Sequence, residues 1–132
     1  MSEMVMVVDD EKGFLHLARK ILEKEGYRVI TAESGAEALE KLRRTRPDLI
    51  LLDVMMPEMD GWELCRRIKG ESSTADIAVA MLTVRDSEED KVKSLGLCRA
   101  DWHITKPDDF KKIGDTVRWL IERSGQKKVS VK

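Results

Sequence analysis

The feature of this sequence that most constrains its fold is a regular alternation of short apolar runs with segments of helical periodicity. Runs that are apolar on both faces are typical of strands in a buried parallel sheet. The runs predict strands at Met4–Val8, Tyr27–Thr31, Leu49–Leu52, Ile77–Leu82 and, more weakly, Ala100–Ile104. Such an alternation requires crossover connections between neighbouring strands, and helices supply them.

Apolar residues spaced three and four positions apart mark the helices predicted between these runs. Gly26 ends the first helix. Ser34 begins the second as its N-cap, with Glu37 three residues on in a capping box, and Pro47 closes that segment. The apolar stripes are Phe14, Leu17, Ile21 and Leu22; then Ala38, Leu39 and Leu42; then Leu64, Cys65 and Ile68, before Gly70; and last Ile113, Val117, Leu120 and Ile121.

The fourth predicted helix is the most weakly held. Ser87 with Asp90 would cap it, but only Val92 and Leu95 are large and apolar along it. Gly114 in the fifth helix costs up to about 1 kcal/mol relative to Ala. Five β-α units in alternation predict an α/β fold: one doubly wound domain whose five-stranded parallel sheet carries helices on both faces.

The length of 132 residues fits one domain that buries its own core. We predict that this domain covers residues 1–123 and that residues 124–132 form a flexible basic tail or the start of a linker. The net charge of −1 offers no general attraction to nucleic acid or to anionic membranes. No stretch approaches the roughly 20 apolar residues of a membrane span. Two distant cysteines, expected to be reduced thiols, suit a cytoplasmic protein.

Polar side chains follow the predicted strands at the edge where ligands bind in open α/β sheets. Asp9 and Asp10 follow the first strand, Asp53 the third, Thr83 the fourth and Lys106 the fifth. Clustered carboxylates repel one another, and Mg²⁺, which prefers a few carboxylates and several waters, relieves that repulsion. A carboxylate can also act as a nucleophile and form an aspartyl phosphate. The set therefore predicts a magnesium-assisted phosphoacceptor site.

Four segments together resemble the receiver domain of bacterial and archaeal response regulators, in the CheY-like superfamily of two-component signalling. They are Val7–Glu11, Pro47–Gly61, Met81–Thr83 and Ile104–Pro107. The resemblance covers nearly the whole chain and implies the strand order 2-1-3-4-5. It implies a signalling domain rather than an enzyme, with chemistry limited to its own phosphorylation and dephosphorylation.

The resemblance also implies roles for individual residues. Asp53 would accept a phosphoryl group from a phosphohistidine on a sensor histidine kinase or a phosphotransfer domain. Asp9, Asp10, Asp53 and the backbone carbonyl of Met55 would hold Mg²⁺. Thr83 would move toward the phosphoryl group as the switch residue.

Further implied roles fall after the fifth strand. Lys106 would pair with the phosphoryl group, and a cis bond before Pro107 would place a tight turn beside the site. His103 stands where the family usually has a Tyr or Phe that moves with the threonine. An unknown effector would bind the face made by the fourth helix, the fifth strand and the fifth helix.

The departures from the family pattern fall in the fourth and fifth units. They are Val84, Arg99, Trp102, His103 and Asp108. His103 is either the switch residue or a half-exposed strand residue. Trp102, on the opposite side of the strand, either packs in the core or anchors a partner.

Two other functions compete with the phosphorylation switch. The first is a constitutive interaction module that works without phosphorylation, which the altered output face favours. The second is a metal-dependent phosphohydrolase with an aspartyl nucleophile. Such enzymes usually carry a second Asp two residues after the first, and Met55 at that position cannot transfer a proton.

Overall fold

A computed structural model of the chain describes residues 3–54, 56, 58–83, 100–105 and 112–130. Five parallel strands form one sheet in the order β2-β1-β3-β4-β5. The elements are β1 (Met4–Val8), α1 (Lys12–Lys24), β2 (Arg28–Ala32), α2 (Gly35–Leu42), β3 (Leu49–Asp53), α3 (Gly61–Gly70), β4 (Ala78–Thr83), β5 (Trp102–Thr105) and α5 (Ile113–Ser130). The predicted fold class and strand order are confirmed, while the fourth predicted helix lies outside the described residues.

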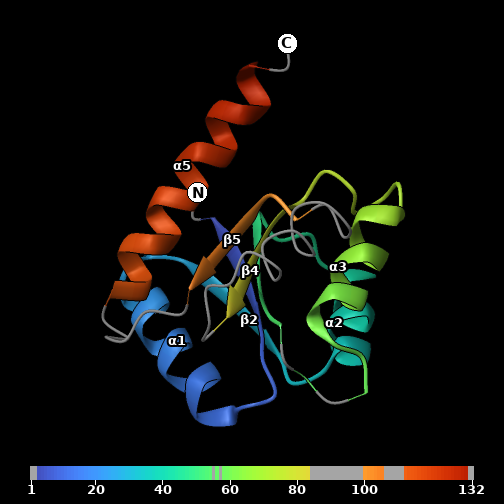
Figure 1. Cartoon of the computed structure of the whole chain (residues 1–132). Coiled ribbons are helices and arrows are strands. Elements are labelled where there is room, and N and C mark those ends of the chain that lie inside the picture. Colours follow the sequence, from blue (N-terminus) through green and yellow to red (C-terminus); the bar gives the residue numbers. More distant parts are fainter. Residues whose placement is uncertain (1–2, 55, 57, 84–99, 106–111, 131–132) are drawn as a thin grey trace.

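The sheet separates two hydrophobic cores, because successive side chains of a strand point to opposite faces. Val5 and Val7 pack in the core that includes residues of α1 and α5. Met6 and Val8 pack in the core that includes residues of α2 and α3. Figure 1 shows the same layering, with α1 and α5 on one side of the sheet and α2 and α3 on the other. All of β3 is buried, so the central strand reads as a continuous apolar run that ends in Asp53.

The helix ends follow the signals in the sequence. Gly26, which follows the C-cap residue Glu25 of α1, adopts a left-handed backbone with φ of 99°, which glycine does without steric cost. Ser34 caps α2, since its Oγ accepts a hydrogen bond from the Glu37 N–H at 3.1 Å. The Glu37 carboxylate in turn accepts from the N–H of Glu33 rather than from that of Ser34. The predicted cap is confirmed, with its return bond shifted by one residue.

The helix α5 continues to Ser130, past the predicted domain boundary at residue 123. The boundary itself stays a prediction. Ser124 is buried, and its hydroxyl donates to the Leu120 carbonyl at 2.8 Å, a bond that keeps this polar side chain within the helix. Among the described residues, no helix is both long and apolar enough to cross a membrane.

Candidate functional site

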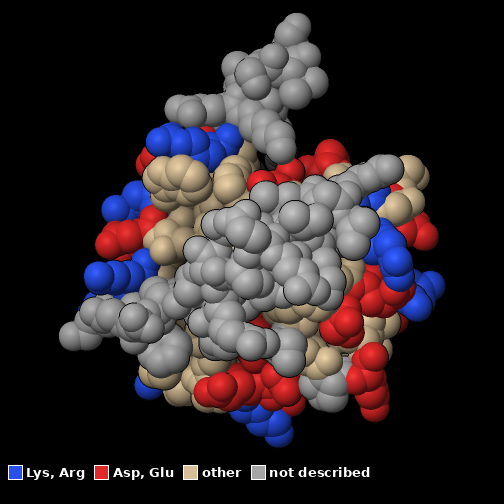
Figure 2. Space-filling model, in the orientation of Figure 1, with Lys and Arg blue, Asp and Glu red and all other residues tan. Residues whose placement is uncertain are grey.

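Three aspartates from two adjacent strands meet at the carboxyl edge of the sheet. Asp53 ends β3, and Asp9 and Asp10 follow β1, which is hydrogen-bonded to β3 in parallel register. One carboxylate oxygen of each residue lies within 4.8 Å of the other two. Figure 2 shows acidic side chains gathered along the lower edge of the molecule, where the strands of Figure 1 end. The predicted convergence of the three acids is confirmed.

The three carboxylates differ in exposure. Asp9 is 1% exposed and Asp53 is 7% exposed, whereas Asp10 lies at the surface. The backbone holds Asp9 in place, because its Oδ1 accepts from the Glu11 N–H at 3.0 Å and its own N–H donates to the Ala32 carbonyl at 3.1 Å. Two of the three acids are therefore nearly buried, and the cluster is open at Asp10. We call Asp9, Asp10 and Asp53 together the acidic recess.

The turn after Asp53 is built around Gly61. A Cβ atom on this residue would lie 2.2 Å from the Asp53 carbonyl oxygen and 2.9 Å from the Val54 Cα, so no other residue fits without moving the backbone. The Gly61 N–H donates to the Val54 carbonyl at 3.0 Å. Asp60 begins α3, its carboxylate accepting from the Glu63 N–H at 2.8 Å. Gly61 therefore fixes the backbone that carries the Asp53 carboxylate.

Sequence reasoning missed the Asp60 cap, although its signal was present. An acceptor side chain followed three residues later by Glu is the pattern that identified Ser34 and Glu37.

Of four other predicted site residues, the structure describes the backbone of one and none of the other three. Thr83 ends β4, one residue beyond the partner of Asp53 in that strand, and its backbone is in register with Thr105 of β5. This places the Thr83 backbone at the edge that holds the acids. Met55, Lys106 and Pro107, including the predicted cis bond, lie outside the described residues.

The two aromatic positions of β5 face opposite sides of the sheet. His103 is half-buried and in register with Met81 of β4. Trp102 packs against the core on the α1 and α5 side. The Trp102 ring meets that of Trp119 edge to face, with centroids 6.4 Å apart. The predicted alternation is confirmed, and of the two predicted environments Trp102 has the packed one.

Among the described tryptophans, Trp119 is exposed at the surface. It is 45% exposed, and the Arg123 guanidinium lies 4.9 Å from the centroid of its ring. Sequence reasoning missed it because it falls off the apolar stripe of α5, which was the only signal used there.

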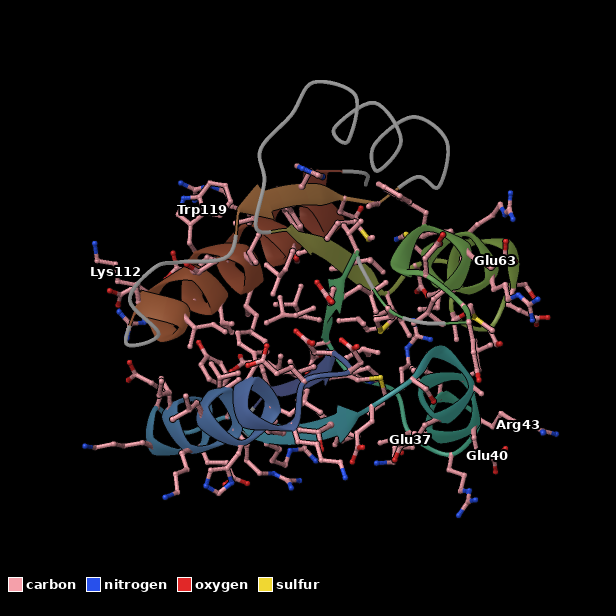
Figure 3. The ribbon with its side chains drawn as sticks, turned by 60° about the horizontal axis from the view of Figure 1, so that its bottom comes forward. Glu37, Glu40, Arg43, Glu63, Lys112 and Trp119 are labelled. Carbon is pink, nitrogen blue, oxygen red and sulfur yellow. The ribbon has the colours of Figure 1, made fainter. Side chains whose placement is uncertain are left out.

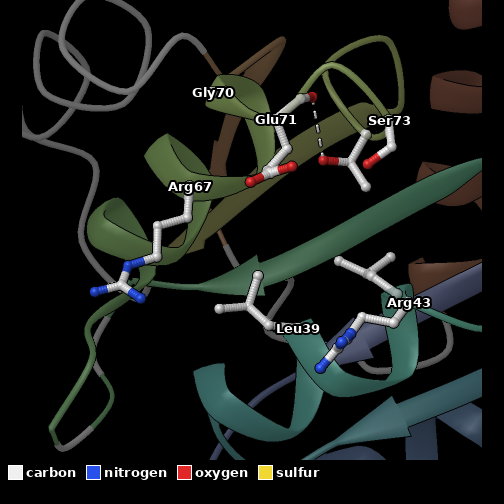
Figure 4. A pocket seen from close by; sticks show the side chains of 8 residues that line it. Leu39, Arg43, Arg67, Gly70, Glu71 and Ser73 are labelled. Atoms are coloured by element: carbon white, nitrogen blue, oxygen red, sulfur yellow. Dashed lines mark hydrogen bonds between the residues drawn. The ribbon is translucent and has the colours of Figure 1, made fainter.

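A separate groove of about 600 Å³ lies between α2 and α3. Leu39 and Leu42 line it together with Arg43, Arg67 and the residues that follow α3 (Figure 4). It contains none of the predicted site residues, so it does not contribute to the acidic recess.

The acidic recess suits a small hard cation. Ligand oxygens around an octahedral Mg²⁺ ion lie roughly 3 to 4 Å apart, because each sits about 2.1 Å from the metal. The 4.8 Å limit on the spacing of the three carboxylate oxygens requires little closure to reach that arrangement. Carboxylates with one open side also leave positions for water and for a phosphoryl oxygen. The residues present therefore fit the predicted cofactor.

The family model of the response regulator receiver domain matches residues 5–118. The chain belongs to this family. Receiver domains are signalling modules of two-component systems and partners of sensor histidine kinases. The resemblance seen in the sequence is thereby confirmed.

Similar proteins come from several groups of organisms. The chain is 41% identical over 124 residues to the alkaline phosphatase synthesis transcriptional regulatory protein PhoP of Bacillus subtilis, covering 94% of this chain and 50% of that protein. It is 37% identical to the response regulator MprA of Mycobacterium tuberculosis, covering 94% and 53%. The chain thus spans about half the length of the curated relatives it matches.

Solved structures share the fold over almost the whole chain. A CheY-like receiver domain protein from Methanospirillum hungatei has a TM-score of 0.84 at 28% identity, covering 96% of this chain and 99% of that one. The signal receiver domain of a histidine kinase from Syntrophus aciditrophicus has a TM-score of 0.80 at 39% identity, covering 92% and 91%.

Proposed function

We propose that this receiver domain is a phosphorylation switch that carries a phosphoryl group on Asp53. The observation that carries the proposal is the acidic recess, in which three carboxylates, two of them nearly buried, lie within 4.8 Å of one another. Like charges this close raise the free energy of the folded protein unless a cation joins them. A fold that keeps such a cluster at its ligand-binding edge is suited to metal-assisted chemistry.

The proposed step is a transfer of phosphorus from nitrogen to oxygen. A carboxylate oxygen of Asp53 attacks the phosphorus of a phosphohistidine on a sensor kinase or phosphotransfer domain. The new P–O bond forms as the P–N bond breaks, and the imidazole leaves with the electron pair and takes a proton from solvent. No general base is needed because an ionised carboxylate is already the nucleophile. Gly61 supports this step by holding the backbone of Asp53 in place.

Mg²⁺ would be held by Asp9, Asp10, Asp53 and the Met55 carbonyl, and when bound it supplies the positive charge that offsets the incoming phosphoryl group. Asp9 is oriented for this role by the Glu11 N–H.

The remaining site residues would read the phosphoryl group. Thr83 and Lys106 would bind its oxygens, Thr83 through its hydroxyl and Lys106 through its ammonium group. His103 would follow Thr83 inward from β5, and a cis bond at Pro107 would shape the turn after Lys106. Phosphorylation would then favour one of two existing conformations of the output face, which consists of the fourth helix, β5 and α5. The effector that binds this face is unidentified.

The second candidate is a constitutive docking module. The exposed Trp119, supported by Trp102 and covered by Arg123, favours it, because aromatic residues and arginine are enriched where proteins bind one another. The two functions differ in their dependence on Asp53. A partner that binds Asp53→Ala as tightly as wild type would identify the docking module.

Intact mass after incubation with Mg²⁺ and a small acyl-phosphate donor tests the switch. We expect wild type to gain one phosphoryl group and Asp53→Asn to gain none. Asp115→Asn is the matched control, since Asp115 is an exposed carboxylate on α5, and it should gain the same mass as wild type. Fluorescence of the indoles with beryllium fluoride, a stable phosphoryl mimic, distinguishes rapid hydrolysis from failure to react. If wild type gains no mass and its fluorescence does not change with beryllium fluoride, the proposal is contradicted.

A further inference from the structure

The outer edge of β2 is an edge of the sheet. β2 is the first strand in the sheet order, so within the described residues only one of its sides pairs with another strand, β1. An open strand edge offers a row of backbone hydrogen-bonding groups on which another strand can add. Whether another strand can extend the sheet at β2 therefore depends on whether these backbone groups are available.

The outward groups of β2 can be identified from its hydrogen bonds. The Arg28 N–H donates to the Glu3 carbonyl at 3.0 Å, and the Ala32 carbonyl accepts from the Asp9 N–H at 3.1 Å. Both bonds point toward β1. Backbone groups of alternate residues in a strand point to opposite sides, so those of Val29 and Thr31 point away from the sheet.

Charged side chains occupy these outward groups from both faces of the sheet. Arg19 of α1 donates from Nη2 to the Val29 carbonyl at 3.1 Å. Lys41 of α2 donates from Nζ to the Thr31 carbonyl at 2.5 Å. Both outward carbonyls of the strand are thus already bound by a cation.

An anion continues the pattern just beyond the strand. The Glu37 carboxylate accepts from the Glu33 N–H at 2.6 Å, and it also pairs with Lys41 at 3.2 Å. Figure 3 shows Glu37 on the side of α2 next to the end of β2. Hydrogen bonds to charged groups are about twice as strong as those between neutral groups. A strand that added here would have to displace them with weaker amide bonds.

We propose that Arg19, Glu37 and Lys41 form a charged clasp that closes the edge of β2 against a second copy of this chain. The occupant follows from symmetry. Two identical edges related by a two-fold axis pair antiparallel, and an axis at Ile30 places Val29 opposite Thr31 of the other copy. These residues carry the outward groups, so each pair would exchange two backbone bonds. The clasps of the two copies together occupy every carbonyl acceptor that these two pairs would use.

Sedimentation over a range of protein concentrations tests the clasp with the double variant Arg19→Met and Lys41→Met. Methionine keeps much of the length of the side chain and removes its charge and its donors. We expect the self-association constant to rise roughly tenfold for each acceptor opened, relative to wild type. The charge-matched control is Lys20→Met with Arg44→Met, one exposed cation from α1 and one from the residues just after α2. It should associate no more than wild type.

Amide hydrogen exchange locates the contact. In the associated double variant the N–H groups of Val29 and Thr31 should become protected, and dilution should remove that protection. If the double variant does not fold, the single variants Arg19→Met and Lys41→Met test the clasp instead, each with an expected intermediate rise. Association no stronger than in the control, or association that leaves these two amides unprotected, would overturn the proposal.

Discussion

Two sites with buried carboxylates lie at opposite edges of the same sheet, and they differ in whether a positive charge balances them. At the carboxyl edge, Asp9 and Asp53 are nearly buried and meet Asp10, so the close neighbours of each carboxylate include two like charges. At the amino edge, the Asp101 carboxylate lies 2.8 Å from the Lys69 ammonium, and both side chains are largely buried.

Both partners of the ion pair at the amino edge make further hydrogen bonds to the backbone. Lys69 also donates to the carbonyls of Ala75 and Ile77, at 3.2 and 2.7 Å, and Asp101 accepts from the Val79 N–H at 2.8 Å. This network joins the end of α3 to the starts of β4 and β5 within the fold itself. The charges at the amino edge balance each other and stabilise the fold. The carboxylates at the carboxyl edge are suited to bind a ligand that supplies positive charge.

The largest effect is expected from Asp101→Ala. It leaves the Lys69 ammonium buried without its carboxylate, which typically costs about 3–5 kcal/mol. Denaturant unfolding should show this loss, whereas Asp115→Ala, at an exposed position of α5, should stay within about 0.5 kcal/mol of wild type. Equal stability of the two variants would mean that the amino-edge pair does not hold the fold together.

Gly61→Ala comes next, because it disturbs the backbone beneath the acidic recess. The added methyl overlaps the Asp53 carbonyl, and we expect a loss of about 1–3 kcal/mol in the free energy of unfolding, together with slower phosphorylation. Gly70→Ala is the matched control, since a Cβ there meets no atom within 4 Å. If Gly61→Ala behaved like this control, the turn would not position Asp53.

Removing charge from the acidic recess should act in the opposite direction. Asp53→Asn relieves repulsion, so we expect it to stabilise the Mg²⁺-free protein by about 1–2 kcal/mol. Added Mg²⁺ should raise the melting temperature of wild type, because a ligand that binds only the folded state stabilises it, and should raise that of the variant much less. A destabilised Asp53→Asn would show that the cluster supports the fold as the amino-edge pair does.

The smallest effect concerns Glu37, a carboxylate at the surface. The Glu33 N–H, followed by the Lys41 ammonium, lowers the pKa of Glu37 below its usual value. A lowered folded-state pKa gives stability that is present above the unfolded pKa of about 4.5 and lost as the pH falls through the folded pKa. Because the Glu37 side chain is 40% exposed, solvent screens its interactions and this contribution is under about 1 kcal/mol. The free energy of unfolding, measured as the pH is lowered, should show this loss in wild type. If the same loss persists in Glu37→Gln, it comes from another group.

The parts of the molecule that could be predicted rest on local signals. The apolar runs identified the strands to within one or two residues, and Ser34 with Glu37 identified the start of α2. The convergence of Asp9, Asp10 and Asp53 followed from a general property of parallel sheets, whose carboxyl ends share one edge.

The parts that were missed depend on contacts distant in sequence or on backbone geometry. Lys69 and Asp101 are 32 residues apart, and nothing near either one indicates its partner. The need for glycine at position 61 could not be predicted, because the approach of the Asp53 carbonyl arises once β3 and α3 are in place. The end of α5 could not be predicted, because its polar last turns lack the apolar stripe by which helices are recognised.

Locating the phosphoryl group on the chain tests whether Asp53 is the phosphoacceptor. An acyl phosphate is reduced by borohydride, which converts a phosphorylated aspartate to homoserine, and peptide mass spectrometry then identifies the position. We expect homoserine at position 53 and unchanged aspartate at positions 9 and 10. Homoserine at another aspartate, or a phosphoryl group that resists borohydride, would contradict it.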